Sequence, residues 1–229
     1  FYLRYSHNIY TTSAKIKILD KKEASMALPS IEDLFSDSKI NLENEIELLS
    51  SYSILSKVVK EQNLNTSFYH FGDIKTTRMA YFPFEFKQLI SSDSNSVESE
   101  FKIFFTNEGI EINDVNKDTT FIFDSYTTYT ASHSLPFNIR WNKASAISSE
   151  YKGYLVIFSI NKKTIDFLKE ELSVEMVGLK SDIIKIQMTN EQPEYAEIVL
   201  NTLIDVFNKD GISDRQMIHK RTIDFVNER

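Results

Sequence analysis

The chain lacks cysteine and is poor in glycine and proline, with five glycines and four prolines in 229 residues. The absence of cysteine excludes disulfides, thiolate metal sites and cysteine nucleophiles, and is compatible with an oxidising compartment. No two glycines lie close enough to form a Walker-type or dinucleotide-binding loop, in which backbone amides must approach phosphate. No stretch approaches 18 consecutive apolar residues, so the sequence contains no membrane-spanning segment.

A basic patch is also lacking. The net charge is -7 and the pI is about 5.2, with lysine and arginine spread along the chain. Such a protein repels a phosphate backbone, so nucleic acid is not an expected partner. Hydrophobic residues make up 41% of the chain and aromatic residues 13%. This composition predicts a folded chain, which at this length can form one domain and bury roughly 70 to 75% of its unfolded surface.

The sequence also lacks a clear grouping of metal-binding or catalytic residues. The four histidines are far apart, and none has a partner at metal-ligand spacing. Glu43 and Glu47 share one face of a predicted helix and could imitate a glycosidase acid/base pair. Glutamates in a first turn are usually exposed, however, and stabilise the positive end of the helix dipole. We therefore predict no catalytic, cofactor-binding or metal-binding residue in this segment, and no cofactor.

The hydrophobic periodicity predicts an α+β fold, with a mixed sheet packed against helices. Residues 9–19 read as a half-exposed strand, with Ile16 and Ile18 on one face and Lys15 and Lys17 on the other. Residues 41–59 read as one helix. Its predicted apolar stripe comprises Leu42, Ile46, Leu49, Tyr52, Leu55 and Val59. Short aromatic and β-branched runs fill the middle of the chain and predict a mostly antiparallel meander.

The last third of the sequence alternates helix and strand signals. A helix is expected over 161–172, followed by a hairpin around Gly178 to Ser181. Pro193 is suited to the first turn of the next helix, which Gly211 is expected to end. Residues 212–229 then read as the start of a long helix that needs a partner surface, because its apolar residues are widely spaced among charges.

Four stretches carry a resemblance to a known family. They are IYTTSAKIKILD (9–20), NLENEIELLSSYSILSKVVKEQNL (41–64), PEYAEIVLNTLIDVF (193–207) and RTIDFVNER (221–229). Together they resemble the periplasmic domain of the Wzz-type chain-length determinants, the polysaccharide co-polymerases of bacterial inner membranes. The positions that carry the match are Asn41, Leu42, Glu45, Ser51, Val58, Pro193, Ala196, Asn201 and Phe225. Tyr52 and Gln62 depart from the arginine and leucine that are usual there.

The resemblance implies a single periplasmic domain over 1–229, on the outer side of the inner membrane and flanked by transmembrane helices. It implies a ring-like homo-oligomer that regulates the length of a surface polysaccharide beside the polymerase or export machinery, without bond-making chemistry. Phe1, Tyr2, Arg4 and Tyr5 favour a membrane–water interface and would be membrane-proximal. An ordinary strand start or a cleaved signal is the alternative explanation for these four residues.

The β-rich region 82–160 resembles an insertion found in enlarged family members fused to a cytoplasmic tyrosine kinase. The full-length parent would then carry that kinase, although this segment has none of its phosphate-binding motifs. A second hypothesis is a carbohydrate-binding module, in which Trp141 and the tyrosines of the middle region form a stacking platform. A third is a glycan-cleaving enzyme that uses Glu43 and Glu47.

Overall fold

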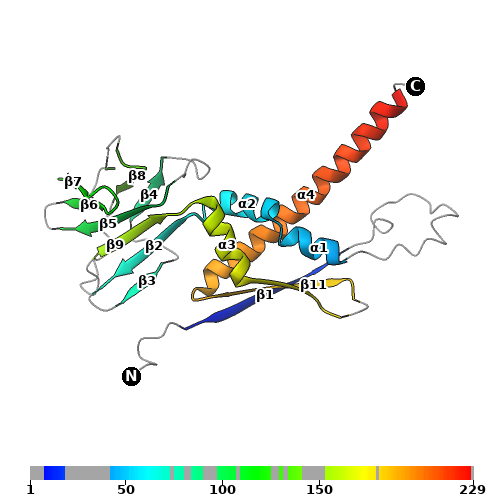
Figure 1. Ribbon diagram of the computed structural model, residues 1–229, viewed down its shortest axis with the longest axis horizontal. Helices are drawn as coiled ribbons and strands as arrows, with labels where there is room; N and C mark the ends of the chain where they lie inside the picture. The colour runs from blue at the N-terminus through cyan, green and yellow to red at the C-terminus, as the bar shows by residue number, and fades with distance from the viewer. Residues whose placement is uncertain are drawn as a thin grey trace. The chain divides into compact units, whose positions relative to one another are not determined.

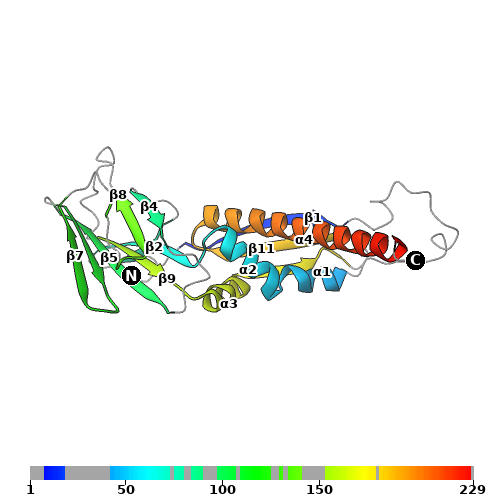
Figure 2. The same cartoon turned by 90° about the horizontal axis from the view of Figure 1, so that it is seen from above.

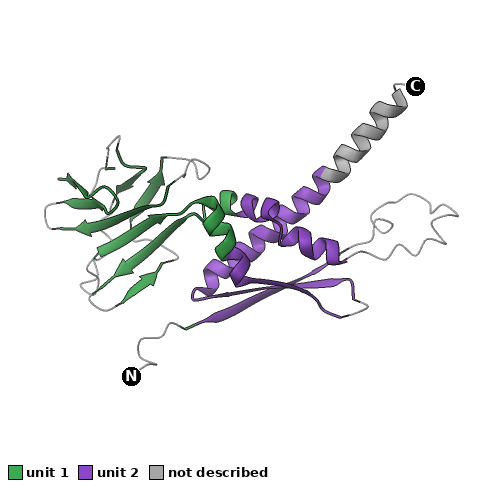
Figure 3. Ribbon diagram, in the orientation of Figure 1, with its two compact units in different colours: residues 1–8, 59–167 green, residues 9–58, 168–229 purple. Residues whose placement is uncertain are grey.

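The computed structural model divides into two compact units (Figure 3). Its described residues are 8–18, 42–72, 75–79, 84–89, 97–106, 109–124, 129–130, 134–140, 153–178 and 181–227, and side chains are described as far as 213. Unit 1 comprises the described parts of 1–8 and 59–167, and unit 2 those of 9–58 and 168–229.

Unit 2 contains a three-stranded antiparallel sheet in the order β1-β11-β10. Its strands are β1 (Tyr10–Lys17), β10 (Leu172–Met176) and β11 (Ile183–Asn190). Two helices lie wholly in unit 2, α1 (Leu42–Leu49) and α4 (Pro193–Asn227). Helices α2 (Tyr52–Glu61) and α3 (Asn161–Glu171) each belong partly to unit 1 and partly to unit 2. Helix α4 packs on β1 and β11 (Figures 1 and 2), so the first strand and the last helix belong to one core.

That core lies between α4 and one face of the sheet. Alternate residues of β11, Ile184, Ile186 and Met188, are fully buried. The buried side of α4 consists of Ala196, Val199, Leu200, Leu203 and Val206. The sequence predicts a buried side made of Ala196, Val199, Leu200, Leu203, Ile204 and Phe207. The first four are buried, but Ile204 and Phe207 are half-buried and Val206 is buried instead.

The helix expected over 41–59 is interrupted, which corrects the sequence-based prediction. Helices α1 and α2 are separated at Ser50 and Ser51. The backbone amide of Ser51 donates to the carbonyl of Leu48 at 3.0 Å, which tightens the end of α1. The Ser51 hydroxyl then accepts the backbone amide of Ile54 at 3.3 Å and so caps α2.

The interruption also moves one member of the predicted apolar stripe. Leu49, Leu55 and Val59 are fully buried, but Tyr52 is 51% exposed. Tyr52 is the first residue of α2, so the continuous helical spacing assumed for it does not apply. Ile54 and Val58 are buried instead.

Gly211 does not end a helix, contrary to the sequence-based prediction. Helix α4 runs through it from Pro193 to Asn227. A helix-ending glycine usually adopts a positive φ. Of the glycines that the structure describes, Gly178 has a positive φ and Gly211 does not. Glycine inside a helix costs only about 1 kcal/mol relative to alanine, which is too little to stop a helix anchored by packing. The expected helix start at 212 is therefore the second half of α4.

Unit 1 is built from two antiparallel sheets. The larger has the order β3-β2-β9-β5-β6-β7 and the smaller pairs β4 with β8. The strands are β2 (Thr66–Phe71), β3 (Thr76–Arg78), β4 (Glu85–Gln88), β5 (Ser99–Phe105), β6 (Ile110–Asp114), β7 (Thr119–Phe123), β8 (Phe137–Arg140) and β9 (Gly153–Phe158). Strands β5, β6 and β7 form the expected antiparallel meander.

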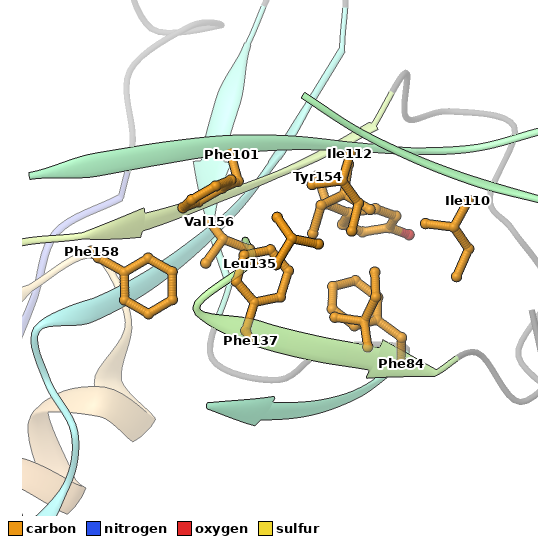
Figure 4. Packing of buried hydrophobic residues seen from close by; sticks show 11 residues of the cluster. Phe84, Phe101, Ile110, Ile112, Leu135, Phe137, Tyr154, Val156 and Phe158 are labelled. Carbon is orange, nitrogen blue, oxygen red and sulfur yellow. The ribbon is translucent and has the colours of Figure 1, made fainter. Parts of the chain in front are cut away.

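Aromatic rings fill the space between these two sheets (Figure 4). Phe137 of β8 stacks on Phe86 at a ring-centroid distance of 5.1 Å and meets Phe101 edge-on at 5.1 Å. It also stacks on Phe158 at 5.9 Å. The core is thus a sheet-on-sheet packing in which alternate residues of each strand point inward.

These elements confirm the α+β class with a C-terminal helix. All strand pairings in the described residues are antiparallel, which refines the expected mixed sheet. Unit 1 extends beyond the β-rich region 82–160, because β2 pairs with β9 and shares its sheet. A single Wzz-like domain carrying an insertion stays a prediction.

Candidate functional site

The carboxylate pair considered for catalysis lies on the outside of α1. Glu43 and Glu47 are both exposed, and Glu43 stands in the first turn of the helix. A glycosidase acid and base work inside a substrate-binding cleft, whereas these two side chains lie on an exposed helix surface. Among the residues described, no group of three or more His, Asp or Glu side chains could hold a metal ion. No helix in the same part of the chain has the length and apolar character of a membrane span.

The described residues that carry the family resemblance lie in or next to α1, α2 and α4. Leu42 and Val58 are buried, Glu45 is half-buried, and Ser51 caps α2. Pro193 begins α4, where Ala196 is buried and Asn201 is exposed. Asn41 lies outside the described residues, and so does the side chain of Phe225.

The predicted membrane-proximal residues Phe1, Tyr2, Arg4 and Tyr5 lie outside the described residues, as does Trp141. Two tyrosines of the β-rich region are described. Tyr154 is 6% exposed and belongs to the aromatic core, so it cannot form part of a stacking platform. Tyr129 is 39% exposed, but the guanidinium of Arg140 lies 4.8 Å from its ring centroid.

In the described part of unit 1, a polar cluster joins Glu85 and Arg140 of the small sheet with Tyr129. Glu85 and Arg140 lie directly opposite each other in the β4–β8 pairing. An Arg140 nitrogen donates to both carboxylate oxygens of Glu85 at 2.7 Å, and the Tyr129 hydroxyl donates to one of them at 2.6 Å. Sequence reasoning missed this cluster, because only the strand register reveals that residues 55 positions apart are neighbours.

Hydrogen bonds from Arg140 and then from Tyr129 lower the pKa of Glu85, and the bond to Glu85 raises the pKa of Tyr129. A carboxyl whose folded pKa is lowered stabilises the protein above its ordinary pKa of about 4.3, and this contribution disappears as the pH falls through the folded value. The three groups satisfy one another at the surface. The cluster therefore links β4 to β8 and Tyr129, and its side chains are engaged with one another rather than aimed at a ligand.

We expect Arg140→Gln to return the Glu85 pKa toward its ordinary value, because the largest cause of the shift is removed. The Glu85 side-chain carboxyl resonance, followed by carbon-detected NMR between pH 2 and 7, measures the change. Arg78→Gln is the control, since Arg78 donates to Ser67 in the other sheet of the unit. An unchanged midpoint in Arg140→Gln would contradict the assignment.

No family model matches the chain, and no curated protein matches it. The resemblance to chain-length determinants therefore remains an expectation from sequence motifs.

Proposed function

We propose that this chain is the periplasmic oligomerising domain of a Wzz-type chain-length determinant. Its role is to regulate the length and export of a capsular, exo- or O-antigen polysaccharide, as a homo-oligomer beside the polymerase. The observation that supports the proposal is that the stretches resembling the family fall mainly in unit 2. Their described parts supply β1, α1, α2 and most of α4. Strands β10 and β11 of unit 2 lie outside these stretches, and unit 1 consists mostly of the residues between 64 and 168.

The direction of α4 supports the same proposal. Tyr10, the first residue of β1, pairs with Asn190, and α4 begins three residues later at Pro193. Because α4 turns back over β11, it runs in the direction of β1 (Figure 1). If β1 follows a membrane span, as the resemblance implies, α4 leads away from that membrane. Its 35 residues extend about 50 Å at 1.5 Å per residue.

The absence of bond-making chemistry is part of the proposal. The described polar clusters are hydrogen-bonded ties, such as Glu85 with Arg140 and Asn190 with Glu171 at 2.7 Å. Unit 1, with its antiparallel sheets, takes the place of the insertion in enlarged members of the family. The same proposal places this chain at the periplasmic face of the inner membrane. It also includes a cytoplasmic tyrosine kinase domain elsewhere in the parent protein.

Deleting the gene tests the function directly. We expect surface-polysaccharide chains of altered length or amount on gel electrophoresis, and restoration by the full-length gene in trans. The matched control is complementation with a gene lacking residues 193–227, because without α4 the core of unit 2 cannot form. An unchanged polymer profile in the deletion strain would overturn the proposal. Crosslinking in native membranes should yield a ladder of homo-oligomers.

A further inference from the structure

The large sheet of unit 1 has an inner face and an outer face. Its inner face packs in the aromatic core, where Ile103 and Tyr154 are buried. Because side chains alternate along a strand, Phe104 of β5 and Gly153 of β9 lie on the outer face. Phe71 of β2 lies there too, since it pairs directly with Gly153. Apart from Gly153, the outer residues of β2, β5 and β9 are only half-buried, so this face meets solvent.

Two aromatic rings occupy the space that a side chain at position 153 would fill. A Cβ atom on Gly153 would lie 2.8 Å from Cζ of Phe71 and 3.1 Å from Cδ1 of Phe104, both closer than an ordinary carbon–carbon contact. The centroids of the two rings are 5.7 Å apart, and their planes meet at 84°. Glycine therefore lets the rings of Phe71 and Phe104 form a right-angled corner over the backbone of Gly153, which we term the ring corner.

Polar side chains surround the ring corner. Lys102 precedes Phe104 by two residues in β5 and so lies beside it on the same face. Glu111 of β6 lies directly opposite Phe104. Tyr69 precedes Phe71 by two residues in β2, and all three polar side chains are half-buried. They supply an amine donor, a carboxylate acceptor and a hydroxyl that can either donate or accept.

The chemistry of this face discriminates between kinds of ligand. Two carboxylates, those of Glu100 and Glu111, accompany the amine of Lys102, and the whole chain carries a net charge of -7, so a phosphate chain would be repelled. A second protein chain also fits poorly, because the cores of protein interfaces are depleted in charged residues. What remains is a ligand with both an apolar surface and many hydroxyls.

A sugar ring has these two properties. The C–H groups on one side of a β-linked hexopyranose can pack on the electron-rich face of an aromatic ring, while its hydroxyls need both donors and acceptors around them. We propose that the ring corner binds a hexopyranose unit of a polysaccharide. The sugar packs against the rings of Phe71 and Phe104, and its hydroxyls form hydrogen bonds with Lys102 and Glu111.

This inference deepens the proposed function and rests on it for the choice of ligand. A chain-length determinant works beside a growing polysaccharide, and the ring corner would give unit 1 a contact with that polymer. It assigns the aromatic contact to Phe71 and Phe104, whereas the carbohydrate-binding hypothesis from the sequence relied on Trp141 and tyrosines. A single subsite binds one sugar weakly, so contact with a polymer would gain from several copies of the chain acting together.

The test is an NMR titration of the 229-residue chain with cellohexaose, a neutral oligomer of β-linked hexopyranoses. We expect the aromatic resonances of Phe71 and Phe104 to shift as the sugar binds. Phe71→Leu should bind about tenfold more weakly, because leucine retains apolar burial but has no ring face for the sugar. Raising the salt from about 0.1 to 1 M should leave the affinity nearly unchanged, since the ligand is uncharged.

Matched variants separate the ring corner from the rest of the sheet. Phe121→Leu is the control, since Phe121 of β7 belongs to the same sheet but packs against the inner core, and it should bind like the parent chain. Lys102→Met retains an unbranched side chain without the amine donor and should weaken binding. Circular dichroism melting checks that each variant is folded.

Equal affinity in Phe71→Leu and the parent chain would overturn the proposal, as would the absence of any shift with both cellohexaose and laminarihexaose. A change in oligomeric mass in Phe71→Leu without sugar binding would assign the corner to contact between copies, which also overturns it. The gene deletion is a separate test. An unchanged polymer profile together with sugar binding at Phe71 would remove only the proposed function, and an altered profile without sugar binding would remove only the ring corner.

Discussion

Replacing Phe137 by alanine is expected to lower the free energy of unfolding of unit 1 by about 3 to 5 kcal/mol. Phe137 is fully buried and contacts the rings of Phe86, Phe101 and Phe158. It joins the small sheet to the large one, so truncation removes apolar burial and leaves a cavity between two sheets that relax only partly.

Chemical denaturation followed by far-ultraviolet circular dichroism measures the loss. The control is Ile122→Ala in β7, whose side chain is 73% exposed and should change the free energy of unfolding by less than about 0.5 kcal/mol. If Phe137→Ala were as mild as this control, the ring cluster would not be the core of unit 1.

Local periodicity was enough to predict much of unit 2. The alternation in β1, the apolar spacing of α4 and the first-turn proline at Pro193 each reflect a rule that acts within a few residues. The break at Ser51 was missed because the apolar spacing on either side of it fits a continuous helix. A cap forms there because the serine hydroxyl can replace one backbone acceptor.

Pairing between distant segments was not predictable. Strand β9 lies between β2 and β5 in the large sheet, and no local pattern in its sequence specifies those neighbours. The same limit applied to the candidate sites. No local pattern places Phe71 beside Gly153 and Phe104. The β2–β9 register places Phe71 opposite Gly153, and the pairing of β9 with β5 brings Phe104 to the same point. The composition of a sheet face is a property of register, which depends on long-range packing.

Replacing Leu203 by alanine is expected to lower the free energy of unfolding of unit 2 by about 2 to 5 kcal/mol. Leu203 is fully buried on the side of α4 that includes Val199 and Val206. The helix follows β11 directly and packs on both β11 and β1, so a cavity at Leu203 weakens the contact that holds the first strand and the last helix in one core.

Thermal unfolding measures the stability loss. Ile198→Ala on the same helix is the control, since Ile198 is 39% exposed and should lose much less. The two core variants also discriminate between the units in cells. Because the stretches that resemble the chain-length determinants supply much of unit 2, Leu203→Ala in the full-length gene should fail to restore normal polysaccharide length. Phe137→Ala should restore more of it, and the reverse order would place the proposed function in unit 1.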